Sequence, residues 1–148
     1  MFAKLRIKGA GTSRQDRLPI SEEQLQALLS KVRNNTAAYA LVVFLADTGA
    51  RLGELVGLEA QDIDLDKGAM HIRPNSIRGL KTKTSVRTVP LSERCQNLAN
   101  SMLEGLSSTS PIFERYGRPR GSDAASGMLM KHLRLVVVDP KVTRSAKT

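Results

Sequence analysis

The sequence predicts an α+β fold, mainly helical, in which the helices pack with a small three-stranded antiparallel β-sheet. Apolar residues recur at helical spacing before residue 61 and again after residue 92. Between these segments the apolar period shortens to two, which is typical of strands. The chain has 148 residues, 41% of them hydrophobic, which is enough for about one domain with its own core.

Three helices are predicted ahead of residue 61. The first begins after Ser21, which forms a capping box with Gln24 and precedes apolar residues at i, i+3, i+4 and i+7. The second runs from Thr36 to Gly49, is nearly all apolar, and should be the buried central helix of the domain. Gly49 is a typical helix end, and a short third helix is predicted to begin at Leu52.

The sheet is predicted from the segment that follows. Residues 63–65 and 70–73 are expected to form a β-hairpin around a turn at residues 66–68. Val86 to Val89 is expected to be the third strand.

Two further helices are predicted after the sheet. Ser92 is expected to cap a helix whose apolar positions extend to Leu106, and the spacing of Cys95 within it indicates a core residue rather than a reactive thiol. Ser122-Asp123 is expected to cap a last helix that ends near Leu135.

The basic residues are segregated along the chain. Residues 18–70 hold four Lys/Arg against eight Asp/Glu, although the net charge of the whole chain is +9. The positive charge therefore lies in residues 1–17, in residues 73–94 and in the tail from residue 115. Such segregation is typical of a surface that binds a polyanion, most often nucleic acid. A solvated basic surface without a partner is the alternative.

Composition also limits the class of protein. Residues 1–17 have the composition of a basic linker or arm, and residues 18–148 form the predicted domain. One cysteine excludes a disulfide framework and a cysteine-rich zinc site. No segment has the roughly 20 apolar residues of a bilayer span, and no signal-peptide core is present. We therefore expect a soluble cytoplasmic protein without membrane association.

Arg51 is the first candidate for chemistry, because it follows directly on the predicted central helix. Its guanidinium offers a planar fork that matches two phosphate oxygens and stays charged near neutral pH. Glu54, three residues later, is expected to hold that guanidinium by a charge-assisted hydrogen bond. An ordinary arginine at a helix end, paired with a glutamate, explains the spacing equally well.

The second candidate is the basic stretch ahead of the third strand. Lys81 and Lys83 would face the same side of a strand. A lysine there can reach DNA and donate a proton to a departing sugar oxygen, because its ammonium can lose a proton. Phosphate contact alone explains both lysines equally well. Arg78, Lys83 and Arg87 are predicted to contact DNA.

Two motifs carry a resemblance to a known family. Thr-Gly-x-Arg-x-x-Glu-Leu-x-x-Leu, from Thr48 to Leu58, is similar to the first arginine box of the tyrosine recombinase, or phage integrase, family. Lys-Thr-x-x-Ser-x-Arg-Thr-Val-Pro-Leu, from Lys81 to Leu91, is similar to the catalytic lysine region of its β-hairpin. The resemblance runs from about Leu18 to the end and implies an integrase-like catalytic domain.

The resemblance implies DNA integration or site-specific recombination of double-stranded DNA without a metal, ATP or another cofactor. A tyrosine attacks the phosphate to form a 3′-phosphotyrosyl link, two arginines stabilise the developing charge, and a lysine protonates the leaving 5′ oxygen. It implies that Arg51 is the first of these arginines, that Glu54 supports it, and that Lys81 is the lysine, with Lys83 as the alternative. It also implies a full-length protein that acts as a homo-tetramer on DNA.

Some parts of the family pattern are not matched. Lys131 to Arg134 comes too soon after the hairpin to be the second box, His-x-x-Arg, and Tyr39 and Tyr116 do not match the position of the nucleophile. Residues 18–148 are therefore expected to be a partial, truncated catalytic domain that binds DNA without catalysis alone. Met1 to Arg17 is too short for the family's N-terminal DNA-clamping domain.

Two hypotheses that assign the chain to other classes of protein remain. In the first, Thr36 to Leu58 forms the helix-turn-helix of a non-catalytic DNA-binding module. The recognition helix would then be Leu52 to Leu58, which is short, apolar and acidic, and lacks side chains suited to base edges. In the second, the chain is a basic helical scaffold, which no specific motif supports.

Overall fold

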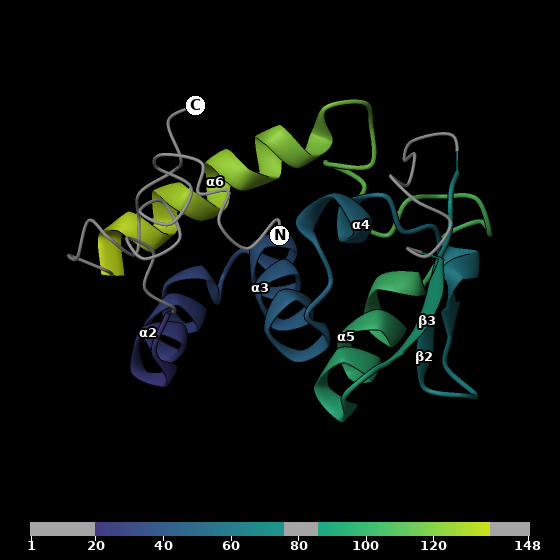
Figure 1. Cartoon of the computed structure of the whole chain (residues 1–148), viewed down its shortest axis with the longest axis horizontal. Helices are drawn as coiled ribbons and strands as arrows, with labels where there is room; N and C mark the ends of the chain where they lie inside the picture. Colours follow the sequence, from purple (N-terminus) through teal and green to yellow (C-terminus); the bar gives the residue numbers. More distant parts are fainter. Residues whose placement is uncertain (1–19, 76–85, 137–148) are drawn as a thin grey trace, which may run out of the picture.

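The computed structural model describes residues 20–75 and 86–136 and confirms the predicted α+β class (Figure 1). The boundary predicted near Leu18 lies outside these residues. The described elements, in chain order, are α2 (Glu22–Val32), α3 (Thr36–Thr48), α4 (Leu52–Val56), the 3-10 helix η2 (Ala60–Asp62), β1 (Ile63–Asp64), β2 (Ala69–Ile72), β3 (Arg87–Pro90), α5 (Glu93–Leu103) and α6 (Gly121–Val136).

The capping box predicted at the start of α2 is confirmed. The Ser21 hydroxyl accepts a hydrogen bond from the Gln24 N–H at 3.2 Å, and the Gln24 side-chain oxygen accepts one from the Ser21 N–H at 2.9 Å. Leu28, Leu29 and Val32 are buried on one face of the helix, as their spacing predicted. The sequence therefore determines both the start of α2 and its packing face.

Helix α3 is the buried central helix. Its N-cap is Asn35, whose side-chain oxygen accepts from the Ala38 N–H at 3.2 Å. Six of its residues are buried, and the Phe44 ring packs edge-to-face on Phe113 with ring centroids 6.0 Å apart. It ends at Thr48 and is capped by Gly49, where φ is +67°, a conformation that a residue with a Cβ rarely adopts.

The three strands form an antiparallel sheet in the order β1-β2-β3. Met70 on β2 lies opposite Ile63 and Val89, and Ile72 lies opposite Arg87. Each strand differs by one residue from its predicted bounds at one end or both: β1 ends at Asp64, β2 runs from Ala69 to Ile72, and β3 runs from Arg87 to Pro90. β1 ends early because the Asp64 carboxylate accepts from the Lys67 N–H at 3.0 Å, which starts the turn.

Helix α5 confirms the prediction for Cys95, whose side chain is fully buried. The predicted extent of the helix was wrong, because α5 ends at Leu103. Glu104 leaves the helical conformation, and Gly105 has a φ of +76°, so Leu106 lies outside the helix.

Helix α6 begins at Gly121, one residue before the predicted cap. A Cβ on Gly121 would lie 1.7 Å from the Tyr116 carbonyl oxygen. Only glycine therefore permits this approach of the preceding loop to the helix.

Figure 1 shows α6 as a long yellow-green helix above the other helices, with β2, β3 and α5 at the right of the view. Helix α6 contacts α2 and α4, while α3 contacts α5. Among the described residues, no helix combines the length and the apolar composition that crossing a membrane requires.

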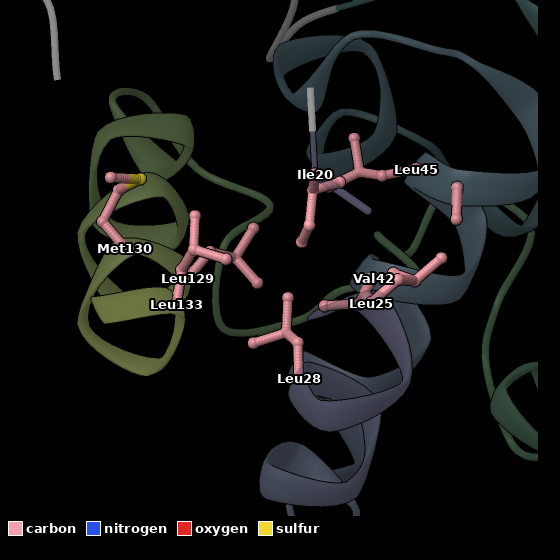
Figure 2. A pocket seen from close by; sticks show the side chains of 9 residues that line it. Ile20, Leu25, Leu28, Val42, Leu45, Leu129, Met130 and Leu133 are labelled. Atoms are coloured by element: carbon pink, nitrogen blue, oxygen red, sulfur yellow. The ribbon is translucent and has the colours of Figure 1, made fainter. Parts of the chain in front are cut away.

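An apolar pocket of about 480 Å³ lies between α2, α3 and α6. Figure 2 shows Leu129 and Leu133 of α6 on one side and residues of α2 and α3 on the other. Every described residue that lines it is Ile, Leu, Val, Ala or Met, so within residues 20–75 and 86–136 no titratable group lines this space. The described part of the pocket is therefore an apolar gap between three helices.

Candidate functional site

The candidate site is built on the junction between α3 and α4. The Thr48 hydroxyl donates to the Phe44 carbonyl oxygen and accepts from the Ala50 N–H at 3.2 Å. Gly49 adopts its left-handed conformation between them, and its N–H donates to the Leu45 carbonyl oxygen at 3.2 Å. The reversal of the chain after the central helix is thus fixed by hydrogen bonds on both sides of Gly49.

Arg51 occupies the N-cap position of α4. Its carbonyl oxygen accepts from the N–H groups of Glu54 and Leu55 at 3.0 and 3.1 Å, and Leu55 is fully buried. The arginine side chain makes no capping hydrogen bond and is exposed to solvent. An exposed guanidinium therefore stands on a backbone that is anchored in the core, as the sequence predicted for this junction.

Glu54 is the third residue of α4, whose N-cap is Arg51, and is one of three buried acidic residues in the described part of the chain. Its oxygen Oε2 accepts from the Arg51 backbone N–H at 2.9 Å. The Arg87 guanidinium donates from Nη1 to Oε1 at 2.9 Å and from Nη2 to Oε2 at 3.0 Å. A buried carboxylate thus joins the start of α4 to the start of β3.

The surroundings of Glu54 favour its charged form. The pKa of Glu54 is lowered from the usual glutamate value, mainly by the hydrogen bond from Arg87, although burial opposes this shift. The Arg51 N–H and the positive charges of Arg87 and Arg51 lower this pKa further. The pKa of Arg87 is raised, first by the hydrogen bond to Glu54. Both members of the pair are therefore ionised at neutral pH.

The sequence predicted a hydrogen bond between Glu54 and the Arg51 guanidinium, but the bond found involves a different group of Arg51. The hydrogen bond found between them runs to the backbone N–H of Arg51, while the guanidinium acts on Glu54 through its charge. The partnership with Arg87 was not foreseen, because a contact between residues 33 positions apart leaves no periodic signal in the sequence.

The other predicted site residues lie between β2 and β3 in the sequence or at the start of β3. Arg78, Lys81 and Lys83 fall outside the described residues. Arg87 is the first residue of β3 and lies opposite Ile72 in the sheet. Its side chain is 39% exposed, and the prediction that it contacts DNA stays a prediction.

Two further buried acidic residues, Glu59 and Asp62, bind the segment that follows β2. Arg73 donates from Nε to Asp62 at 2.6 Å and from Nη2 to Glu59 at 3.4 Å, and the Glu59 N–H donates to Asp62 at 3.0 Å. Asn75, two residues beyond Arg73, donates from its amide to the Gly57 carbonyl oxygen at 2.6 Å. Sequence reasoning missed this cluster; the acidic residues ahead of β1 were the available signal.

Both tyrosines of the chain are packed against the core. Tyr39 lies in α3 and is partly covered, and Tyr116 is 3% exposed. A phenol that attacks DNA must reach solvent near the phosphate-binding groups, and the buried position of Tyr116 prevents this.

Lys131 and Arg134 lie on the continuous helix α6, in agreement with the prediction that they belong to a helix begun before them.

The described residues offer few groups to hold a metal. Within residues 20–75 and 86–136, no set of three or more His, Cys, Asp or Glu side chains is arranged to bind a metal ion. The described part of the candidate site consists of the exposed Arg51 and the ionised pair of Glu54 and Arg87.

Comparisons with known proteins agree with this fold. The sequence model described as the phage integrase family matches residues 19–134. A search of curated proteins gave no match. The crystal structure of XerA recombinase has a TM-score of 0.62 to this chain at 24% sequence identity, covering 79% of this chain and 41% of that one.

Structures of the Tn1549 transposon integrase are similar as well. The complex with circular intermediate DNA has a TM-score of 0.64 at 18% identity, covering 88% of this chain and 49% of that one. The complex with transposon right end DNA has a TM-score of 0.59 at 20% identity, covering 78% and 44%. The chain thus spans less than half the length of these solved structures, and the likeness shows a shared fold.

Proposed function

The chain belongs to the phage integrase family, and on that basis we propose that it takes part in DNA integration or site-specific recombination of double-stranded DNA. In this proposal DNA is broken and rejoined through a 3′-phosphotyrosyl intermediate. The Tn1549 integrase structures, which contain DNA, support DNA as the partner. Assembly as a homo-tetramer on DNA follows from the family resemblance alone. A DNA substrate is also consistent with the cytoplasmic location expected from the sequence.

The exposed guanidinium of Arg51 on its anchored backbone is the observation that carries this proposal. A planar, permanently charged donor can bind two oxygens of a scissile phosphate at once. Because its backbone is fixed by the core, little reorganisation is needed when negative charge develops on the phosphate. Arg51 is therefore proposed to be the first arginine of the phosphate clamp, with Glu54 as its support.

The remaining assignments rest on the resemblance. Lys81, or alternatively Lys83, is proposed to protonate the leaving 5′ oxygen, since a lysine ammonium can give up a proton. Arg78 and Lys83 are proposed to contact the DNA backbone. No cofactor enters this chemistry, because the phosphotyrosyl link conserves the energy of the broken bond.

We propose that these 148 residues, taken alone, bind DNA without cleaving it. The burial of Tyr116 and the partial burial of Tyr39 in the central helix support the proposal that neither supplies the nucleophile. The geometry also disfavours the helix-turn-helix reading. Helix α4 has five residues, and Glu54, Leu55 and Val56 are buried, so it presents no recognition surface for a DNA groove.

The chain incubated with a nicked double-stranded DNA tests this proposal. We expect binding that weakens steeply with salt, because phosphate contacts release counterions, and no protein–DNA adduct that survives detergent. Absence of binding at low salt would contradict a DNA partner. A detergent-resistant adduct would show that the chain does contain a nucleophile, contrary to the proposal.

A further inference from the structure

The pair formed by Arg87 and Glu54 connects two parts of the chain that the proposed chemistry needs at the same place. Arg87 begins β3, and Glu54 lies in α4, which Arg51 caps. The side chain of Glu54 is 6% exposed, whereas that of Arg87 is 39% exposed. The arginine therefore reaches inward from the surface to a carboxylate that water hardly reaches.

The hydrogen bonds form a continuous path from Arg87 to Arg51. The two guanidinium nitrogens bind the two carboxylate oxygens of Glu54 at 2.9 and 3.0 Å. Oε2, one of these oxygens, also accepts from the Arg51 backbone N–H at 2.9 Å. The orientation of the carboxylate plane is thus set by Arg87, and the backbone of Arg51 is held by that carboxylate.

We propose that Arg87 is a positioning residue for Arg51, acting through Glu54, rather than a direct contact to DNA. The inference rests on the proposed function, because it concerns how the phosphate-binding arginine is aimed. A two-point guanidinium–carboxylate pair fixes both distance and plane, which a lysine, as a point charge, does not. Arg87 is itself held in register by its place in β3 opposite Ile72.

The charges of the pair support the same assignment. A guanidinium bound to an ionised carboxylate contributes little net positive charge to a DNA-facing surface. Arg51, in contrast, is exposed and makes no capping hydrogen bond. The two arginines therefore differ in role: Arg51 can bind a phosphate, and Arg87 orients Arg51.

A double-mutant cycle between Arg51→Ala and Arg87→Gln tests this inference, with the affinity of the chain for a DNA duplex as the readout. In the otherwise unchanged chain, Arg51→Ala is expected to weaken binding roughly tenfold, as for loss of a charged hydrogen bond. In the Arg87→Gln background the same change should weaken DNA binding less than about twofold, because Arg51 is no longer held in the orientation that binds phosphate.

Arg94→Gln is the matched control. Arg94 also pairs with a carboxylate, that of Asp47, and its side chain is 44% exposed. In this background Arg51→Ala should keep its roughly tenfold effect. The thermal midpoint and the helical circular dichroism of each variant show that it is folded at the assay temperature. Where Arg87→Gln fails to fold, Arg87→Lys, which keeps the charge but not the fork, takes its place in the cycle.

Two results would overturn the inference and are distinguishable. If Arg51→Ala weakens binding about tenfold both in the otherwise unchanged chain and in the Arg87→Gln background, Arg87 does not position Arg51, while the proposed phosphate-binding role of Arg51 stands. If Arg51→Ala has no effect in the unchanged chain, the proposed site itself fails, and the inference fails with it.

Discussion

The Glu54 carboxylate accepts a 2.9 Å hydrogen bond from the backbone N–H of Arg51. This bond satisfies a donor at the start of α4 that has no partner within the helix. It also places a buried negative charge beneath an exposed arginine. Because the same carboxylate binds Arg87, the free energy of folding and the geometry of the site depend on one ionised side chain.

Glu54→Gln is expected to destabilise the chain at neutral pH by roughly 1–3 kcal/mol, because a charged hydrogen-bond acceptor of Arg87 is lost. The pKa of Glu54 is lowered in the folded chain from a reference value of 4.5. Its contribution to stability is therefore fully present above that value and is lost as the pH falls through the lower, folded pKa. Chemical unfolding of both proteins at a series of pH values measures this contribution.

The difference in unfolding free energy between the unchanged chain and Glu54→Gln should thus shrink as the solution becomes acidic. Ser101→Ala, at an exposed position on α5, serves as a control whose effect should not change with pH. A Glu54→Gln effect that stays constant from neutral to strongly acidic pH would contradict the ionised pair.

Alanine substitutions at two glycines of α6 should change the stability of the chain in opposite directions. Gly121→Ala places a Cβ 1.7 Å from the Tyr116 carbonyl oxygen, and we expect a loss of about 3 kcal/mol or more. Gly127→Ala meets no atom within 4 Å and should stabilise the helix by about 0.5–1 kcal/mol. Thermal unfolding of both variants measures this contrast. Equal effects of the same sign would contradict the close packing of the loop against Gly121.

Asp62→Ala should destabilise the chain by about 2–4 kcal/mol, because it leaves the Glu59 N–H and the Arg73 guanidinium without this buried acceptor. Asp66→Ala, in the exposed turn of the hairpin, is the control and should change stability by less than about 0.5 kcal/mol. Denaturant unfolding provides both values. Similar values for the two variants would show that the buried cluster does not anchor the hairpin.

Cys95 should resist thiol reagents in the folded chain. Its side chain is fully buried, and burial raises the pKa of the thiol, so the reactive thiolate is both inaccessible and disfavoured. We expect no modification in mildly alkaline buffer and complete modification in denaturant, measured by mass spectrometry. Rapid modification of the folded chain would place Cys95 outside the core.

The elements with local signals were predictable from the sequence. The capping box of α2, the apolar run of α3 and the glycine after Thr48 each act within a few residues, so the order of the residues reveals them. The end of α5 was not predictable, because Leu106 keeps the apolar spacing although Gly105 has already left the helix. Apolar periodicity reports which residues face the core and does not report where hydrogen bonding stops.

The geometry of the candidate site was predictable only in part. The sequence predicted an outward-facing Arg51 after a buried helix and a neighbouring Glu54, whose roles stay predictions. The path from Glu54 to Arg87 depends on the position of β3 beside α4, which arises from the packing of the whole domain. The same reason explains why the cluster of Glu59, Asp62 and Arg73 was not foreseen.

The central claim is that the exposed guanidinium of Arg51 binds a DNA phosphate, and the salt dependence of DNA binding by Arg51→Ala tests it most directly. The change should spare the fold, because the side chain makes no capping hydrogen bond. Arg33→Ala, at an exposed arginine after α2, is the matched control. We expect Arg51→Ala to weaken binding at every salt concentration and to reduce the slope of log affinity against log salt by about 1, as for one lost phosphate contact. Affinity and slope equal to those of Arg33→Ala would contradict the claim.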